Sequence, residues 1–362
     1  MRLEELDFDV PEGSIAQRPA EPRDSCRLMY LDRQGSVHHG RFFDLPQYLR
    51  PGDTLVLNDS RVLAARVQAT KPTGGCVELL FLRPIDGRPQ RVGEVWEVLA
   101  RPSHRLRPGT ELTVAGTQRL ILRERLGEGR WLVGGPAGSS MVAVMDAHGA
   151  LPLPPYIKTY PDDPSSYQTV YAAAPGSAAA PTAGLHFTPG LLERLRRSGV
   201  RSASVTLHVG LDTFQPIREP VVEEHRIHRE TYSVSSTAVK TIRSTLQSGD
   251  RLVAVGTTTA RVLETLATRG LLAGSERPGA TTGSTEIFMT PGHRFQAVHV
   301  LLTNFHLPRS TVLALVMAFA GIEPVHRAYA EAIDRGYRFF SFGDAMLIEA
   351  PVLEEPGGRQ SR

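Results

Sequence analysis

The chain has 362 residues, of which 41% are hydrophobic and 22% charged, and its formal net charge at pH 7 is +3. This length predicts two domains, or one domain with a large insertion. No apolar stretch approaches the roughly 20 residues of a membrane span, and the acidic N-terminus does not resemble a signal peptide. We therefore expect a globular cytoplasmic protein without membrane insertion. Because no extended association seam is evident, we expect a monomer.

The charge permits a nucleic-acid partner without requiring one. Only Lys71, Lys158 and Lys240 are lysines among the 41 basic residues, so 38 are arginines. Arginine suits phosphate binding and base stacking, but the same bias arises from genomic base composition. The two cysteines, Cys26 and Cys76, belong to no CxxC or metal-ligand cluster.

The first part of the chain contains one clear strand. A Pro-Gly-Asp turn at 51–53 precedes the apolar run 54–57, which predicts a buried strand that ends at Asn58 and Asp59. From 62 to 138 the pattern changes to short β-rich runs separated by Gly, Pro and Asp. This change predicts a small all-β unit, most simply a barrel.

After Met141 helices alternate with strands, which predicts an α/β layer fold. The clearest helix covers 189–198, with Thr188 as its N-cap and Gly199 as its stop. The other expected elements are strands at 202–209, 251–256 and 298–305, and helices at 238–247, 257–270, 310–320 and 325–335.

Small residues surround the histidine that attracts most attention. The segment 180–189 (APTAGLHFTP) presents His186 just before a helix start, where the positive dipole end favours anions and lowers a histidine pKa. Thr182 lies in the same segment, and His208 ends the strand of the LHVG motif. A structural loop and a functional one are equally compatible with this pattern.

A second cluster invites a metal hypothesis. The segment 223–232 contains His225, His228 and Glu230 within a few residues. A zinc pair on a helix needs a spacing of four, whereas the two histidines are three apart and prolines precede them. These side chains could equally act as general acids or bases.

Two strand-to-helix turns offer polar groups to a ligand. In AVGTTTARVLE, Thr257, Thr258 and Arg261 follow a strand and open a helix, which is the arrangement of an anion cradle. Neither a Walker loop nor a GxGxxG fingerprint is present. Asn304 and His306 occupy the corresponding place in LLTNFHLPRST.

Near the end of the chain, RGYRFFSFGDA brings arginine, aromatic and acidic residues together. Arg338 and Phe339 could stack on bases if exposed. Core packing is the competing interpretation for Phe339 and Phe340. Asp344 adds a carboxylate that could transfer protons.

Taken together, these motifs resemble those of one family, the S-adenosylmethionine:tRNA ribosyltransferase-isomerases of queuosine synthesis. The resemblance spans nearly the whole chain and keeps the family's order. It is carried by IAQRPAEPRDSCRL, PGDTLVLNDSRVLAAR, GGCVELLFL, LPLPPYI, YQTVYA, AAPTAGLHFT, TLHVGLDTFQP, EEHRIHRETY, AVGTTTARVLE, LLTNFHLPRST and YRFFSFGDAM.

The resemblance implies a discontinuous large α/β domain interrupted by a small β-barrel domain. On this sequence the large domain would comprise 1–61 and 141–350, the barrel 62–140, and a disordered tail 351–362. It also implies transfer and isomerisation of the ribosyl group of S-adenosylmethionine onto 7-aminomethyl-7-deazaguanine at the tRNA wobble position. Epoxyqueuosine-tRNA, adenine and methionine would be the products, with no metal or separate cofactor.

This chemistry requires a base, an acid and a pocket that excludes water. The sulfonium acidifies the neighbouring ribosyl 5′ hydrogens, and adenine leaves more readily when it is protonated. The residues that we expect to be catalytic are His186, His208, His228, Glu230 and Asp344. Those that we expect to bind substrate are Asn58, Thr182, Thr257, Thr258, Arg261, Asn304, His306, Arg338 and Phe339.

Four positions depart from the family pattern. Asp212, Gln215, Ile227 and Phe342 stand where glycine, arginine, methionine and tyrosine are usual, so Gln215 and Phe342 receive no role. Two other functions remain open. A metal-dependent hydrolase would use the histidine cluster, and a non-catalytic RNA-binding protein would use the arginines and aromatic residues only to stack and neutralise.

Overall fold

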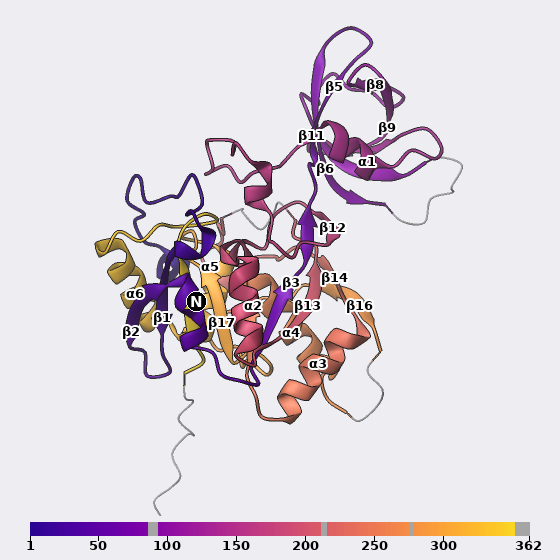
Figure 1. Cartoon of the computed structure of the whole chain (residues 1–362). Helices are drawn as coiled ribbons and strands as arrows, with labels where there is room; N and C mark the ends of the chain where they lie inside the picture. The colour runs from indigo at the N-terminus through magenta and orange to yellow at the C-terminus, as the bar shows by residue number, and fades with distance from the viewer. Residues whose placement is uncertain (86–92, 211–215, 275–278, 352–362) are drawn as a thin grey trace, which may run out of the picture.

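The computed structural model describes residues 1–85, 93–210, 216–274 and 279–351. A large α/β body and a smaller all-β body stand side by side (Figure 1). The expected tail from residue 352 onward, Asp212 and Gln215 lie outside the described residues.

A nine-stranded sheet forms the centre of the large body. Its spatial order is β16 (Thr281–Thr285), β14 (Glu230–Val234), β13 (Arg201–Leu207), β3 (Thr54–Asn58), β15 (Leu252–Val255), β17 (Val300–Asn304), β18 (Ala345–Glu349), β1 (Arg27–Leu31) and β2 (Val37–Arg41). The four central strands β13, β3, β15 and β17 run parallel. Their carboxyl ends therefore meet at one edge, where α/β sheets commonly bind ligands.

Helices cover both faces of this sheet. One face carries α3 (Ser236–Gln247), α4 (Thr257–Thr268), α5 (Thr311–Ala320) and α6 (Ile322–Asp334), and the other carries α2 (Pro189–Arg197). Their starts follow the expected capping rules. The hydroxyls of Thr188, Ser235 and Ser310 accept hydrogen bonds from the first turns of α2, α3 and α5.

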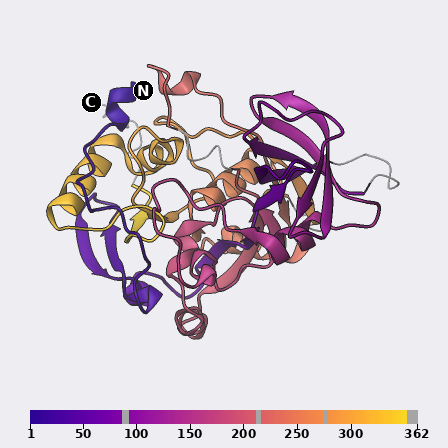
Figure 2. The ribbon, with the colours of Figure 1, turned by 90° about the horizontal axis from the view of Figure 1, so that it is seen from above.

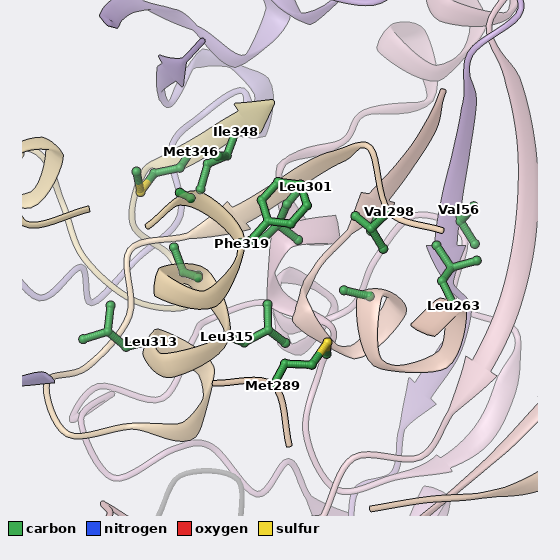
Figure 3. Close-up of a cluster of buried hydrophobic side chains, with 14 of the residues drawn as sticks. Val56, Leu263, Met289, Val298, Leu301, Leu313, Leu315, Phe319, Met346 and Ile348 are labelled. Atoms are coloured by element: carbon green, nitrogen blue, oxygen red, sulfur yellow. The ribbon is translucent and has the colours of Figure 1, made fainter. Parts of the chain in front are cut away.

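The larger core lies under the helices α3 to α6. Figure 3 shows Phe319 of α5 beside Leu301 of β17, Leu315 on the same helix, and Leu263 of α4 near Val56 of β3. All five side chains are buried. Burying each aliphatic or aromatic side chain of this size contributes about 2 kcal/mol, so the core holds α4 and α5 against one face of the sheet.

The smaller body is a closed antiparallel barrel. Its strands are β5 (Arg66–Thr70), β6 (Cys76–Pro84), β7 (Val95–Arg101), β10 (Arg130–Gly134), β9 (Gln118–Gly127) and β8 (Glu111–Val114), and pairing of β5 with β8 closes the circle. Inward residues such as Val67, Leu79 and Trp131 alternate with outward polar ones. The barrel stands to one side of the α/β body in both views (Figures 1 and 2).

Contacts of the barrel continue beyond residue 140. Helix α1 (Met141–His148) packs Met141 and Met145 into the barrel core, and β11 (Gly149–Ala150) pairs with β5. A short parallel pair, β4 (Ser60–Val62) with β12 (Ala174–Ser177), lies between the two bodies. The predicted α/β fold with an additional β-barrel is confirmed. Among the described residues no single helix is long and apolar enough to cross a membrane, and only α5 and α6 together, bent by 113°, reach that length and composition.

A buried ion network stabilises the amino edge of the sheet. Arg251 donates to Asp53 and to Glu349, at 2.6 Å each, and all three side chains are at most 7% exposed. Replacing Arg251 by methionine leaves two buried carboxylates without their shared partner. We therefore expect the free energy of unfolding to fall by about 3–5 kcal/mol. Denaturant titration measures this change. Arg196→Met, which breaks an exposed pair on α2, should cost under about 1 kcal/mol, and an equal effect of both would contradict the role of the network.

Candidate functional site

A pocket opens at the carboxyl edge of the central strands. It has a volume of about 230 Å³ and is bounded by the ends of β15 and β17, by the segment 179–183 and by Tyr156. Its lining residues include Thr182, Thr257, Thr258, Asn304, His306, Phe340 and Ser341. Three segments that the sequence analysis singled out separately, at 182, 257–258 and 304–306, therefore share one cavity.

A smaller pocket of about 50 Å³ adjoins the first. It is lined by His225, Ile227, His228, Glu230, Arg261 and neighbouring apolar residues of α5. Thr257, Thr258 and Val312 line both pockets. The first turn of α4 thus separates a larger apolar cavity from a smaller charged one.

The shared wall is the N-terminus of α4. Gly256 precedes the helix with φ = +89°, a conformation that favours glycine because other residues clash there. No side chain caps this helix end, so the backbone N–H groups of its first turn and its positive dipole end face the region between the pockets. Asn58 supports the turn from behind, with Nδ2 donating to Thr258 Oγ1 at 3.4 Å. This arrangement suits an anionic or polar ligand.

An ion pair forms the floor of the smaller pocket. Arg261, one helical turn after Thr257, donates through Nη1 to Glu230 Oε2, and Glu230 is only 6% exposed. Its Nε donates to the Ile287 carbonyl at 3.4 Å. Its Nη2 is buried and has no hydrogen-bond partner among the described residues. A buried guanidinium N–H without a partner is costly, so this donor indicates a place for an acceptor on a ligand.

A hydrogen-bond relay lies behind the larger pocket. Asn304 donates through Nδ2 to His186 Nε2 at 3.0 Å and to the Phe340 carbonyl at 3.2 Å, and its Oδ1 accepts from Thr182 at 2.8 Å. Because Nε2 accepts, the imidazole carries its hydrogen on Nδ1, which lies 3.3 Å from Cys26 Sγ. Burial, with the charges of Arg338 and Arg23 nearby, lowers the pKa of His186 to about 3. His186 is therefore neutral and lies behind Asn304, outside the pocket lining.

One wall of the larger pocket is aromatic. The rings of Tyr156 and Phe340 lie 4.9 Å apart, and the Tyr156 hydroxyl is 2.8 Å from Ser341 Oγ. Burial raises the pKa of Tyr156 to about 12, so its hydroxyl stays protonated. Phe340 has φ = +69°, which costs a non-glycine residue about 1–3 kcal/mol. Tyr156 and Ser341 were not among the site residues predicted from the sequence. Tyr156 lies in the quoted LPLPPYI motif, but only the tertiary fold brings it to this cavity.

Several predicted site residues lie outside both pockets. Phe339 is fully buried between Phe305 and Tyr329, so it packs the core and is not exposed for base stacking. Asp344 is 2% exposed and accepts from the backbone N–H groups of Arg27 and Arg338, which organises a loop. The remaining residues in this group are Asn58, His186, His208 and Arg338.

The histidine cluster is already engaged by protein partners. His225 Nδ1 lies 2.9 Å from Glu219, and Glu230 pairs with Arg261. Within the described ranges, no group of three or more His, Cys, Asp or Glu side chains is placed to hold a metal ion. Of the other departing positions, Ile227 lines the smaller pocket, and Phe342 is buried against Tyr167.

The buried histidines predict how stability depends on pH. Burial lowers the pKa of His186 to about 3 and that of His306 to about 4, from 6.5 in an unfolded chain. The unfolded state therefore binds more protons below pH 6.5, and folding stability falls as the pH drops from 6.5 toward 4. At pH 5 each histidine should lower the free energy of unfolding by an amount on the order of 2 kcal/mol. Denaturant titrations at pH 7 and 5 test this; a His186→Gln variant with an unchanged difference between the two pH values would contradict it.

Comparison with known proteins identifies the family. The model of the family described as queuosine biosynthesis protein matches residues 3–348. A protein of Rubrobacter xylanophilus named S-adenosylmethionine:tRNA ribosyltransferase-isomerase is 51% identical over 350 residues, covering 96% of this chain and 98% of that protein. One of the same name from Moorella thermoacetica is 48% identical over 354 residues, covering 96% and 100%.

A solved structure agrees with these relatives. The crystal structure of the S-adenosylmethionine tRNA ribosyltransferase from Thermotoga maritima is 37% identical to this chain, with a TM-score of 0.54, and covers 95% of this chain and 99% of that one. The family model and the relatives each span nearly the whole sequence. The chain therefore belongs to the queuosine biosynthesis family, as a transferase-isomerase of the S-adenosylmethionine:tRNA ribosyltransferase-isomerase type.

Proposed function

We propose that this enzyme transfers and isomerises the ribosyl group of S-adenosylmethionine onto the aminomethyl group of 7-aminomethyl-7-deazaguanine at the wobble position of tRNA. Epoxyqueuosine-tRNA is the modified product, and adenine and methionine are released. The names of the relatives supply the donor and the tRNA. The arrangement of the two pockets supports the way in which the donor is held.

One observation carries this proposal. Arg261, whose buried Nη2 has no hydrogen-bond partner among the described residues, lines the smaller pocket with Glu230. Thr257 and Thr258, in the first turn of α4, line both this pocket and the larger cavity. The methionine end of S-adenosylmethionine has a carboxylate and an ammonium group, which match Arg261 and Glu230. The adenosyl end then lies in the larger pocket, with the ribose hydroxyls at Thr257 and Thr258.

The larger pocket offers what the adenine side of the reaction requires. The Tyr156 and Phe340 rings provide an apolar surface for the purine. Removal of a 5′ hydrogen and protonation of departing adenine both need proton carriers in the pocket walls. His228 lines the smaller pocket, so we propose its imidazole for proton transfer. His306 lines the larger pocket, where burial lowers its pKa to about 4 and keeps it neutral, and we propose that it binds the substrate. His186 acts through Asn304 as a positioning residue.

The direct test is product analysis. Purified enzyme is incubated with S-adenosylmethionine and tRNA that bears 7-aminomethyl-7-deazaguanine, and free adenine and the anticodon nucleoside are measured by mass spectrometry. We expect equal amounts of adenine and epoxyqueuosine, and no adenine when guanine replaces the modified base. Formation of S-adenosylhomocysteine, or adenine release that does not depend on the modified tRNA, would contradict the proposal.

We further propose that turnover requires neither a metal nor a separate cofactor, because the chain's own groups match the charges of the donor. Dialysis against a chelator should leave at least about 80% of the activity, whereas the metal-dependent hydrolase alternative requires its loss together with stoichiometric zinc. The monomeric state and the cytoplasmic location remain predictions from the sequence. Sedimentation equilibrium tests the first.

A further inference from the structure

The positive charge of this protein is concentrated in the barrel. Residues 62–140 contain 12 basic and 7 acidic residues, a net charge of +5, and the rest of the chain, with 29 basic and 31 acidic residues, carries −2. The proposed reaction centre at the large sheet does not use this charge. A strongly basic domain next to an α/β body is the electrostatic pattern of a phosphate-binding surface.

The fold gathers part of this charge at one end of the barrel. The indole of Trp131 donates to Ser103 Oγ at 2.9 Å, which anchors the loop between β7 and β8 over the β9–β10 turn. The Arg125 guanidinium lies 6.0 Å from the Trp131 ring on the same side. We name this end of the barrel the basic rim. It consists of Arg101, His104, Arg105, Arg107 and Arg125.

The basic rim is open to solvent and is not neutralised by the protein. All five of its side chains are exposed, and within the described ranges none forms an ion pair. The barrel arginines that are neutralised lie elsewhere: Arg83 and Arg130 both pair with Glu97. Leu126, 45% exposed, adds an apolar contact beside Arg125.

Arg101 lies two residues along the strands from the level of the junction with the α/β body. The chain enters and leaves the barrel where Arg66 of β5 pairs with Ala150 of β11. Across the sheet, Arg66 pairs with Leu80 of β6, which pairs with Leu99 of β7. Arg101 and the loop after it lie farther along, in the direction in which β5 runs away from that junction. The barrel stands to one side of the α/β body (Figure 1), so a ligand that touches both the pockets and the rim must extend from one body to the other.

We propose that the basic rim binds the sugar-phosphate backbone of the tRNA at a distance from the base being modified. This inference rests on the proposed function, which places the wobble base at the pockets. An RNA stem leaving the pockets extends past the barrel, and exposed arginines bind phosphates without reading sequence. The rim then raises affinity for whole tRNA and contributes nothing to the chemistry.

The test is a pair of charge-reversed variants of the full chain. Arg105→Glu with Arg107→Glu changes the rim, and Lys240→Glu with Arg327→Glu makes the same charge change at exposed positions of α3 and α6. Binding of whole tRNA at about 0.1 M salt, and of an isolated anticodon stem–loop, is measured by fluorescence anisotropy. Adenine release is measured at saturating tRNA.

We expect the rim variant to weaken whole-tRNA binding at least about tenfold and to lower the slope of log affinity against log salt by about 2. Stem–loop binding and adenine release at saturation should stay within about twofold of the unchanged enzyme, as should all values of the control variant. Equal tRNA binding by both variants would overturn the inference. So would a rim variant that loses binding to anionic phospholipid vesicles but keeps its binding to tRNA. If the unchanged enzyme binds tRNA but releases no adenine, the proposed function fails, and the binding comparison still decides the role of the rim.

Discussion

Replacing Arg261 by methionine should raise the Kd for S-adenosylmethionine by at least about 100-fold. The substitution removes the donor that we assign to the substrate carboxylate, and it leaves Glu230 buried without its ion-pair partner. Truncating one member of a buried, hydrogen-bonded charge pair typically costs about 2–5 kcal/mol in binding. Because the lost interaction is made to the ground state as well, KM should rise more than kcat falls. Isothermal titration and steady-state kinetics measure the two effects.

A matched substitution at the C-cap of the same helix separates binding from stability. Arg269 directly follows α4 and donates to the Tyr232 hydroxyl and to the Ser284 carbonyl of β16. It lines neither pocket. Arg269→Met should therefore bind S-adenosylmethionine within about threefold of the unchanged enzyme. If both variants lose affinity equally, the effect comes from a disturbed helix, and the assignment of Arg261 is wrong.

Replacing His186 by phenylalanine should lower kcat/KM by about 10- to 100-fold without altering the pH profile between 6 and 8. Phenylalanine fills the space but cannot accept the hydrogen bond from Asn304, so the amide that joins Thr182 to Phe340 loses its orientation. A lost hydrogen bond in a buried network costs about 1–3 kcal/mol. With a pKa of about 3, His186 does not titrate in this pH range.

The conservative replacement provides the control for this prediction. The side-chain carbonyl of glutamine can accept from Asn304 as Nε2 does, so His186→Gln should recover most of the lost kcat/KM. A general base would behave differently, because its removal lowers the rate by about 100- to 10,000-fold and deletes one limb of the pH profile. A rate loss of about 100-fold or more in both variants, with one limb of the pH profile missing, would return His186 to the reaction itself.

The fold could be predicted from local sequence signals because those signals are strong. The runs at 54–57 and 251–256 are apolar enough to specify buried strands, and the Thr188 and Ser310 caps mark helix starts that the structure keeps. The change to short β-rich runs at residue 62 likewise predicts the barrel. Local patterns cannot specify that α1 packs on the barrel, because Met141 and Met145 would suit the core of the barrel or that of the α/β body.

The candidate site was predictable only in part, and the reason is tertiary. Thr257, Asn304 and Arg261 follow strands whose carboxyl ends share an edge, so their convergence follows from the parallel sheet. The depth of a side chain does not follow from such a pattern. His186 and Phe339 lie in motifs of polar and aromatic residues, yet packing of Phe42 and Phe305 against them buries both.

The central claim is that Arg261 holds the carboxylate of the donor in the smaller pocket. The measurement that tests it most directly is a comparison of the Kd for S-adenosylmethionine with that for its decarboxylated analogue, in the unchanged enzyme and in Arg261→Met. We predict that the unchanged enzyme binds the analogue at least about 100-fold more weakly, whereas Arg261→Met binds the two ligands about equally. Equal affinities in the unchanged enzyme would show that the carboxylate lies elsewhere, and would contradict the account.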